Sequence, residues 1–107
     1  MPSERRLIRF APTEVEDALR RFAQEQQRTM PDGKVTGIAY DVESDEGVSA
    51  RVQFEDVKPP MHFTALEMAA ALIAYCRKVQ VPIPKQGQKS LHRHNDTLVL
   101  QIDVKPR

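Results

Sequence analysis

Apolar residues recur at helical spacing in two segments of the chain. In the first, PTEVEDALRRFAQEQQRTM, they lie three and four positions apart, and Thr13 with Glu16 forms a T-x-x-E capping box. This pattern predicts a helix from about Thr13 up to the turn signal PDGK, where Pro31 cannot continue the helix. The predicted buried positions are Val15, Ala18, Leu19, Phe22 and Ala23.

The second helical segment covers residues 64–79. Thr64 and Glu67 form another capping box, and Phe63 with Met68 occupy the positions of a hydrophobic staple. Between Glu67 and the last turn there is no charge, so the pattern predicts a central helix that is buried on nearly every side. Its predicted core residues are Leu66, Leu72, Ile73, Tyr75 and Val79.

Elsewhere apolar and polar positions alternate, which is typical of strands with one buried face. Residues 6–10 predict a first strand, residues 35–54 a hairpin around an acidic loop, and residues 89–104 a second hairpin turning at HND. The proline-containing stretches KPP and VPIPKQGQ are interpreted as connectors, because proline removes backbone donors. The inner faces of the hairpins are predicted to carry Ile38, Tyr40, Val42, Val48, Ala50, Val52, Phe54, Leu98, Leu100, Ile102 and Val104.

The predicted fold class is therefore α+β, in a single domain of residues 1–107 with the order β-α-β-β-α-β-β. We expect two layers: a mainly antiparallel five-stranded sheet with both helices on one face. Residues 10–56 and 63–104 repeat the order of helix and hairpin about fifty residues apart. Whether this αββ pseudo-repeat reflects duplication stays open, since few residues are identical.

Charge and cysteine content indicate the kind of compartment and partner that the protein has. The 107 residues carry a net charge of only +1, yet residues 35–67 hold seven acids and two bases while residues 68–94 hold five bases and no acid. The single cysteine, Cys76, cannot form an internal disulfide, which favours a reducing compartment. Neither a signal-peptide core nor a run long enough to span a membrane is present, so a cytoplasmic protein with no membrane partner is expected.

The basic stretch YCRKVQVPIPKQGQKSLHRHN is the candidate site. Its exposed amides and unneutralised bases are the features that bind anions, although cations at a helix end or on a strand edge also have purely structural reasons. An acidic protein partner, another copy's acidic loop at residues 41–46, or nucleic acid are the partners considered. The candidate binding residues are Arg77, Lys78, Lys85, Lys89, His92, Arg93 and His94.

The motifs for phosphate-loop, metal-binding and cysteine chemistry are less convincing than the basic stretch. GQKS lacks the earlier glycine of a phosphate loop, and DVESDEG has its glycine one residue too late for a calcium loop. His92 and His94 would share a strand face, but a zinc site needs a third ligand, for which only His62 or Cys76 is on offer. Cys76 is predicted to be a buried structural residue. No catalytic residue, metal or cofactor is therefore assigned.

The segment LIAYCRKVQVPIPKQGQKSL, residues 72–91, resembles short bacterial proteins of unknown function, in which a helix ending in Tyr-Cys-Arg leads into a Pro-x-Pro-basic connector. The resemblance implies a bacterial cytoplasmic protein and no particular activity. The sequence thus favours a small non-enzymatic binding or protein-interaction module, with self-association as a homodimer also open. Nucleic-acid or phosphoryl-ligand binding through the same segment is the alternative, and a small enzyme is a third class.

Overall fold

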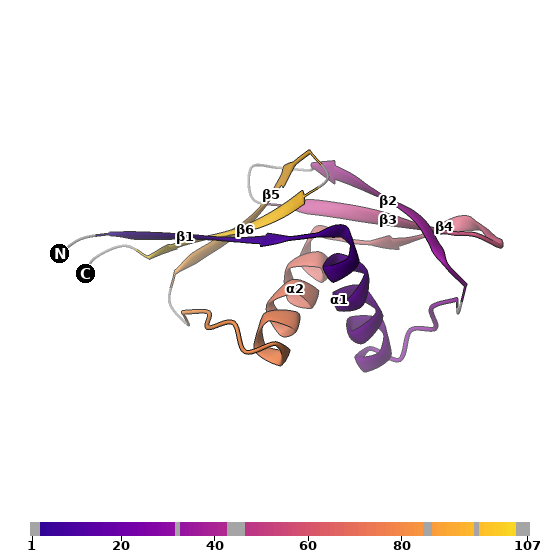
Figure 1. The fold of residues 1–107 in the computed structure, drawn as a ribbon, viewed down its shortest axis with the longest axis horizontal. Coiled ribbons are helices and arrows are strands. Elements are labelled where there is room, and N and C mark those ends of the chain that lie inside the picture. Colours follow the sequence, from indigo (N-terminus) through magenta and orange to yellow (C-terminus); the bar gives the residue numbers. More distant parts are fainter. Residues whose placement is uncertain (1–2, 32, 43–46, 85–86, 96, 105–107) are drawn as a thin grey trace.

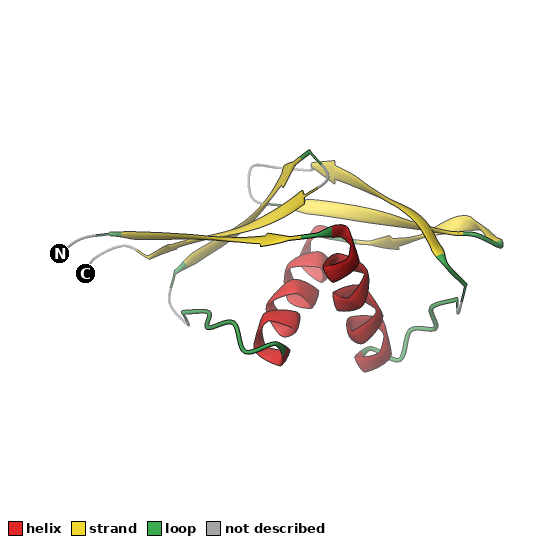
Figure 2. Cartoon of the chain, viewed as in Figure 1, coloured by secondary structure: helices red, strands yellow, loops and turns green. Residues whose placement is uncertain are grey.

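The computed structural model describes residues 3–31, 33–42, 47–84, 87–95 and 97–104. The six strands form two antiparallel three-stranded sheets, ordered β1-β6-β5 and β2-β3-β4, and both helices lie on the same side of these sheets (Figures 1 and 2). The molecule is elongated, 53 × 24 × 19 Å. Its elements are β1 (Glu4–Phe10), α1 (Pro12–Glu25), β2 (Val35–Val42), β3 (Val48–Phe54), β4 (Val57–Phe63), α2 (Ala65–Lys78), β5 (Gln88–His94) and β6 (Thr97–Val104).

The prediction of one five-stranded sheet is wrong, because a strand lies where a connector was expected. β4 contains Pro59 and Pro60, yet it pairs with β3 through Phe63 opposite Ala50 and Met61 opposite Val52. β4 is the outer strand of its sheet, where a missing backbone donor is tolerated. β4 is the third strand of the hairpin β2-β3, and β1 is the third strand of the hairpin β5-β6, so the strands form two sheets.

The helix prediction is confirmed for α1, which buries all five expected residues. For α2 it is wrong in extent, because this helix buries only one face, through Met68, Ala71, Leu72 and Cys76. Leu66 is 84% exposed and Val79 is 46% exposed. The alanines of α2 make its sequence apolar without requiring a neighbour on every side, and Ala71 packs in the core that α2 shares with Ala18 of α1.

For the predicted helix starts the outcome is reversed, with α2 correct and α1 wrong. The Thr64 cap is confirmed: Thr64 Oγ1 accepts the Glu67 amide proton at 3.2 Å, and a Glu67 carboxylate oxygen accepts that of Thr64 at 2.9 Å. The Thr13–Glu16 box is wrong. α1 begins one residue earlier, at Pro12, and Glu14 accepts the Ala11 amide proton at 2.9 Å. Proline suits the first helical position because its nitrogen has no proton to donate.

The chain runs twice through the order strand, helix, strand, strand. The first three elements begin at residues 4, 12 and 35 and again at 57, 65 and 88, a constant offset of 53 residues. The helix ends match as well: Gln27 and Gln80 both have positive φ, 56° and 64°. After each, a backbone amide bonds back five residues at 2.8 Å, from Arg28 to Ala23 and from Val81 to Cys76. We call residues related by this offset counterparts.

Each half lends its first strand to the hairpin of the other half. β1 pairs with β6, and β4 pairs with β3 (Figure 1). The core is shared accordingly: Phe10 and its counterpart Phe63, and Leu19 and its counterpart Leu72, are all at most 2% exposed. The inner hairpin positions expected from alternation are confirmed for β3 and for most of β6, where Val104 is half-buried, whereas Val42 is 63% exposed.

Candidate functional site

The structure divides the predicted basic residues among several surfaces. Lys89 and His92 lie on opposite faces of β5, because successive side chains of a strand alternate. Lys78 lines a cleft between the two helices. Lys85, and positions 43–46 of the acidic loop, lie outside the described residues. Of the remaining predicted residues, Arg77 lies near the end of α2, and Arg93 and His94 lie at the end of β5.

The first surface is a groove on the helix side, between the C-terminal half of α2, the proline connector and β5. We call it the helix-side groove. It encloses about 500 Å³ and is lined by Ile73, Arg77, Ile83, Pro84 and Lys89. The connector is tied to β1 by Arg6, whose guanidinium donates to the Pro82 carbonyl at 3.1 Å. In the first turn of α2, exposed Leu66 adds an apolar side chain to the helix surface beyond the groove.

The cations of this groove are not neutralised within the described part of the chain. The ion pairs found there join Arg5 to Asp103, Arg6 to Glu4, Arg20 to Glu16, Arg21 to Asp17, Arg28 to Glu67 and Arg51 to Asp41. Neither Arg77 nor Lys89 is among these residues. An open groove with apolar walls and two unpaired positive charges attracts anionic groups that carry apolar neighbours.

The corresponding place in the first half of the chain is filled. The counterpart of Ile73 is Arg20, which donates to the carbonyls of Pro31 at 3.3 Å and Gly33 at 3.2 Å. Arg20 also pairs with Glu16 at 3.3 Å and lies 5.9 Å from the centre of the Phe54 ring. One long side chain therefore occupies the space between α1 and its connector that Ile73 leaves open beside α2.

The second surface is on the outer face of the sheet β1-β6-β5, away from the helices. A hollow of about 250 Å³ is lined there by Leu7, Arg9, His92, Arg93, His94, Thr97, Val99 and Gln101. We call it the outer-face hollow. The strand register places Arg9 and His92 on either side of Val99. His92 is held by a hydrogen bond of 3.0 Å between its Nε2 and the Ser90 hydroxyl.

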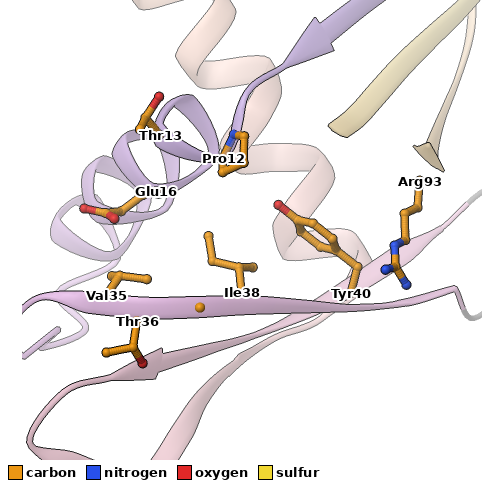
Figure 3. A pocket seen from close by; sticks show the side chains of 9 residues that line it. Pro12, Thr13, Glu16, Val35, Thr36, Ile38, Tyr40 and Arg93 are labelled. Atoms are coloured by element: carbon orange, nitrogen blue, oxygen red, sulfur yellow. The ribbon is translucent and has the colours of Figure 1, made fainter. Parts of the chain in front are cut away.

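A third hollow, of about 390 Å³, lies between the first turn of α1 and β2. Figure 3 shows its side chains, with Arg93 reaching from the end of β5 toward Tyr40. Arg93 Nε donates to the Asn95 carbonyl at 3.0 Å, and Glu16 at the opposite end is already paired with Arg20. The charged groups of this hollow are therefore partly engaged by the protein itself.

Nucleophilic and metal chemistry find little support in these surroundings. Cys76 is buried as expected, and burial, with a contribution from Glu14, raises the pKa of its thiol. A raised pKa keeps the sulfur in its unreactive thiol form. His62 lies on β4 in the other sheet, so it does not join His92 and His94. Among the residues described, no three potential ligands of types His, Cys, Asp and Glu gather as a metal site would require.

Several lining residues of the two surfaces were missed as site residues, and three of them show why. Ile73 was assigned to the core, against which it does pack, Ile83 to a connector, and Arg9 to a strand whose partner was unknown. The signal for Ile73 was present in the repeat, because aligning the two halves sets it against Arg20. No comparable signal pointed to Arg9, since its position beside β5 residues depends on the pairing of β1 with β6.

Comparison with known proteins adds no relative. The chain matches no protein-family model, no curated protein and no solved structure. Within the described ranges, no helix has both the length and the apolar character needed to cross a membrane.

Proposed function

We propose that this protein is a non-enzymatic interaction module that holds an acidic, partly apolar segment of a partner protein in the helix-side groove. The observation that carries the proposal is the replacement of Arg20 by Ile73 at counterpart positions. Arg20 occupies its site and satisfies two backbone carbonyls, whereas Ile73 leaves a hollow of about 500 Å³ open beside Arg77 and Lys89.

Charge selects the partner. Arg77 and Lys89 come from different elements, the end of α2 and the start of β5, and both line the groove without an ion pair among the described residues. Carboxylates of a bound segment would supply the missing partners. Such charge complementarity speeds encounter and rejects basic segments of similar shape.

Apolar contacts and a rigid connector would also contribute to the affinity for the partner segment. Ile73, Ile83 and Pro84 give the groove an apolar wall, and exposed Leu66 offers a further contact along α2. Pro82 and Pro84 restrict the connector before binding, so less conformational entropy is lost when a partner docks. The single buried Cys76 suits a reducing compartment, and we place this function in the cytoplasm.

A peptide library displayed on phage tests the proposal. Selection on the immobilised protein should enrich peptides that combine Asp or Glu with Leu, Ile or Phe, and fluorescence anisotropy then gives their affinity. Arg77→Gln should weaken the selected peptides about tenfold, because a charge contact with the peptide carboxylates is lost. The matched control is Gln24→Glu, which changes the net charge by the same amount at the counterpart position on α1.

Two outcomes of the peptide experiment would overturn the proposal. One is enrichment of basic or uncharged peptides, or of none. The other is an equal loss of affinity in Arg77→Gln and Gln24→Glu, which would show that overall charge, and not the helix-side groove, controls binding. Sedimentation of the protein alone is run in parallel. Dimerisation abolished by Arg77→Gln would assign the groove to a second copy of this chain instead of a partner protein.

A further inference from the structure

The outer face of the sheet β1-β6-β5 brings together cationic and hydrogen-bonding groups from all three strands. We infer that the outer-face hollow binds a small phosphorylated ligand, a phosphate ester on a short polar carbon skeleton. Arg9 comes from β1, Gln101 from β6, and His92 with His94 from β5. This site lies on the opposite side of the sheet from the helix-side groove and is independent of the proposed function.

Arg9 is the main charge of the site. It is exposed and forms no ion pair with any described residue. The acid nearest to it along the outer face of β6 is Asp103, which Arg5 binds at 2.8 Å and to which the Gln101 side chain donates at 2.9 Å. No described lining residue carries a carboxylate. The positive potential of Arg9 is therefore directed to solvent, where an anion can reach it.

The two imidazoles add directed contacts. The Ser90 hydroxyl fixes the His92 ring at 3.0 Å, and His94 lies two residues along on the same face of β5. The register sets His92 beside Val99, which is opposite Arg9, and His94 beside Thr97. A phosphate oxygen bound by the Arg9 guanidinium would thus find imidazole and hydroxyl groups as further partners.

On the outer face of the other sheet, the corresponding charges are paired with each other. On the outer face of β2-β3-β4, Arg51 pairs with Asp41 at 3.1 Å. The counterpart of Asp41 is His94, so the acid that neutralises one face is replaced by an imidazole on the other. The same backbone arrangement therefore presents a self-paired surface on one sheet and, on its equivalent, a cationic hollow whose Arg9 has no ion pair among the described residues.

The size and walls of the hollow indicate a small ligand. Its volume of about 250 Å³ suits a phosphate with a few attached carbons, and Leu7 and Val99 provide apolar contact for them. Thr97 and Gln101 offer hydrogen bonds to hydroxyl groups. Binding of single-stranded nucleic acid typically uses Phe, Tyr or Trp side chains on which bases stack, and the described lining residues include none of these three types.

Two-dimensional amide NMR with ribose 5-phosphate, inorganic phosphate and ribose as probes tests this inference. Ribose 5-phosphate should shift resonances of β1, β5 and β6 saturably, with ribose alone giving no shift and phosphate a weaker one. Arg9→Gln should reduce the affinity for ribose 5-phosphate at least about fivefold, because the charged contact is lost. Arg51→Gln removes one positive charge from the other outer face and should leave the affinity unchanged.

Each other result counts against the inference. Shifts spread over both sheets, or equal losses in Arg9→Gln and Arg51→Gln, would indicate binding by net charge only. No saturable shift with either phosphate probe would remove the site. A short oligothymidine that binds this face when ribose 5-phosphate does not would assign the surface to nucleic acid. Loss of peptide binding in the helix-side groove has no bearing on any of these readouts.

Discussion

The helix-side groove and its counterpart beside α1 have one backbone plan and opposite surfaces. Beside α1, Arg20 fills the space, binds the carbonyls of Pro31 and Gly33, and is paired with Glu16. Beside α2, the shorter Ile73 side chain leaves part of the corresponding space open, and Arg77 and Lys89 have no ion pair among the described residues. The difference shows that side-chain length and charge at one position separate a filled joint from an open groove, while the fold is unchanged.

The outer faces of the two sheets show the same contrast between a surface that is paired internally and one that is open. Asp41 and Arg51 neutralise each other on β2-β3-β4, whereas Arg9, His92 and His94 face solvent without a described acid on β1-β6-β5. In both comparisons the internally satisfied surface is the one beside the first hairpin. Both open surfaces belong to the sheet built from the second hairpin and β1.

The largest expected effect tests whether the two halves are equivalent in their core. Leu19 and its counterpart Leu72 are both 0% exposed. Leu19→Ala and Leu72→Ala should each lower the free energy of unfolding by about 2–5 kcal/mol, since each removes buried apolar volume and leaves a cavity. Urea denaturation measures both. Costs that differ by more than about 2 kcal/mol would break the equivalence of the halves in the core.

Arg28 sharpens the comparison, because its counterpart Val81 makes no similar contacts. The Arg28 guanidinium bonds Glu67 at 2.8 Å and the His62 carbonyl at 3.0 Å, and lies 4.7 Å from the centre of the Phe63 ring. Arg28→Ala should cost about 1–3 kcal/mol in unfolding free energy.

The control is Arg21→Ala, which removes an exposed helix pair with Asp17 and should cost about 0.3–0.5 kcal/mol. Equal costs for the two arginines would mean that the contact of Arg28 with the start of α2 adds no stability.

Ile73→Arg tests the groove itself by placing the side chain of the first half in the second. The new guanidinium would lie near Pro84, the counterpart of Pro31, and should weaken groove-selected peptides at least about tenfold, or about 1.4 kcal/mol. Fluorescence anisotropy gives the affinity, and Ile73→Leu, which conserves volume, should keep it. Unchanged affinity in a folded Ile73→Arg protein would place the peptide elsewhere.

The smallest expected effect concerns the cap of α2. The backbone hydrogen bond from Thr64, the Thr64 hydroxyl and the charges of Arg28 and His62 lower the pKa of Glu67, against an opposing effect of burial. A lowered folded-state pKa stabilises the protein above the ordinary value of 4.5, and this stabilisation is lost as the pH falls through the folded pKa.

The advantage of the wild type over Glu67→Gln should therefore be about 1 kcal/mol near pH 7 and should shrink near pH 3, as measured by urea denaturation. The difference between wild type and Leu19→Ala involves no titrating group and serves as the control. If the stability difference between wild type and Glu67→Gln grew as the pH fell, the inferred lowering of the Glu67 pKa on folding would be contradicted.

Local patterns predicted the helices and most strands because these elements depend on nearby residues. Helical spacing found α1 and α2, and Thr64 with Glu67 placed the start of α2 correctly. β4 was missed because Pro59 and Pro60 argue against a strand until its place at a sheet edge is known. The two-sheet arrangement depends on pairing between residues far apart in the chain, which no local pattern encodes.

The candidate site was predicted in composition and not in arrangement. The basic residues of the segment were identified, but the alternation of β5 sends Lys89 and His92 to opposite faces. Arg9 reached the outer-face hollow only through the pairing of β1 with β6. The role of Ile73 emerged from its counterpart, since an isoleucine in an apolar helix gives no sign that an open space lies beside it.

The exchange of first strands has a consequence for how the protein is made. β1 is synthesised before the other described strands, yet its hydrogen-bonding partner is β6, the last of them, so Phe10 can pair with Leu98 only after β6 has been made. Contacts that span most of a chain slow folding and keep a strand edge open in the meantime. The sheet that contains β1 therefore closes only after β6 has been synthesised, whereas β4 directly follows β3 and can complete the other sheet earlier.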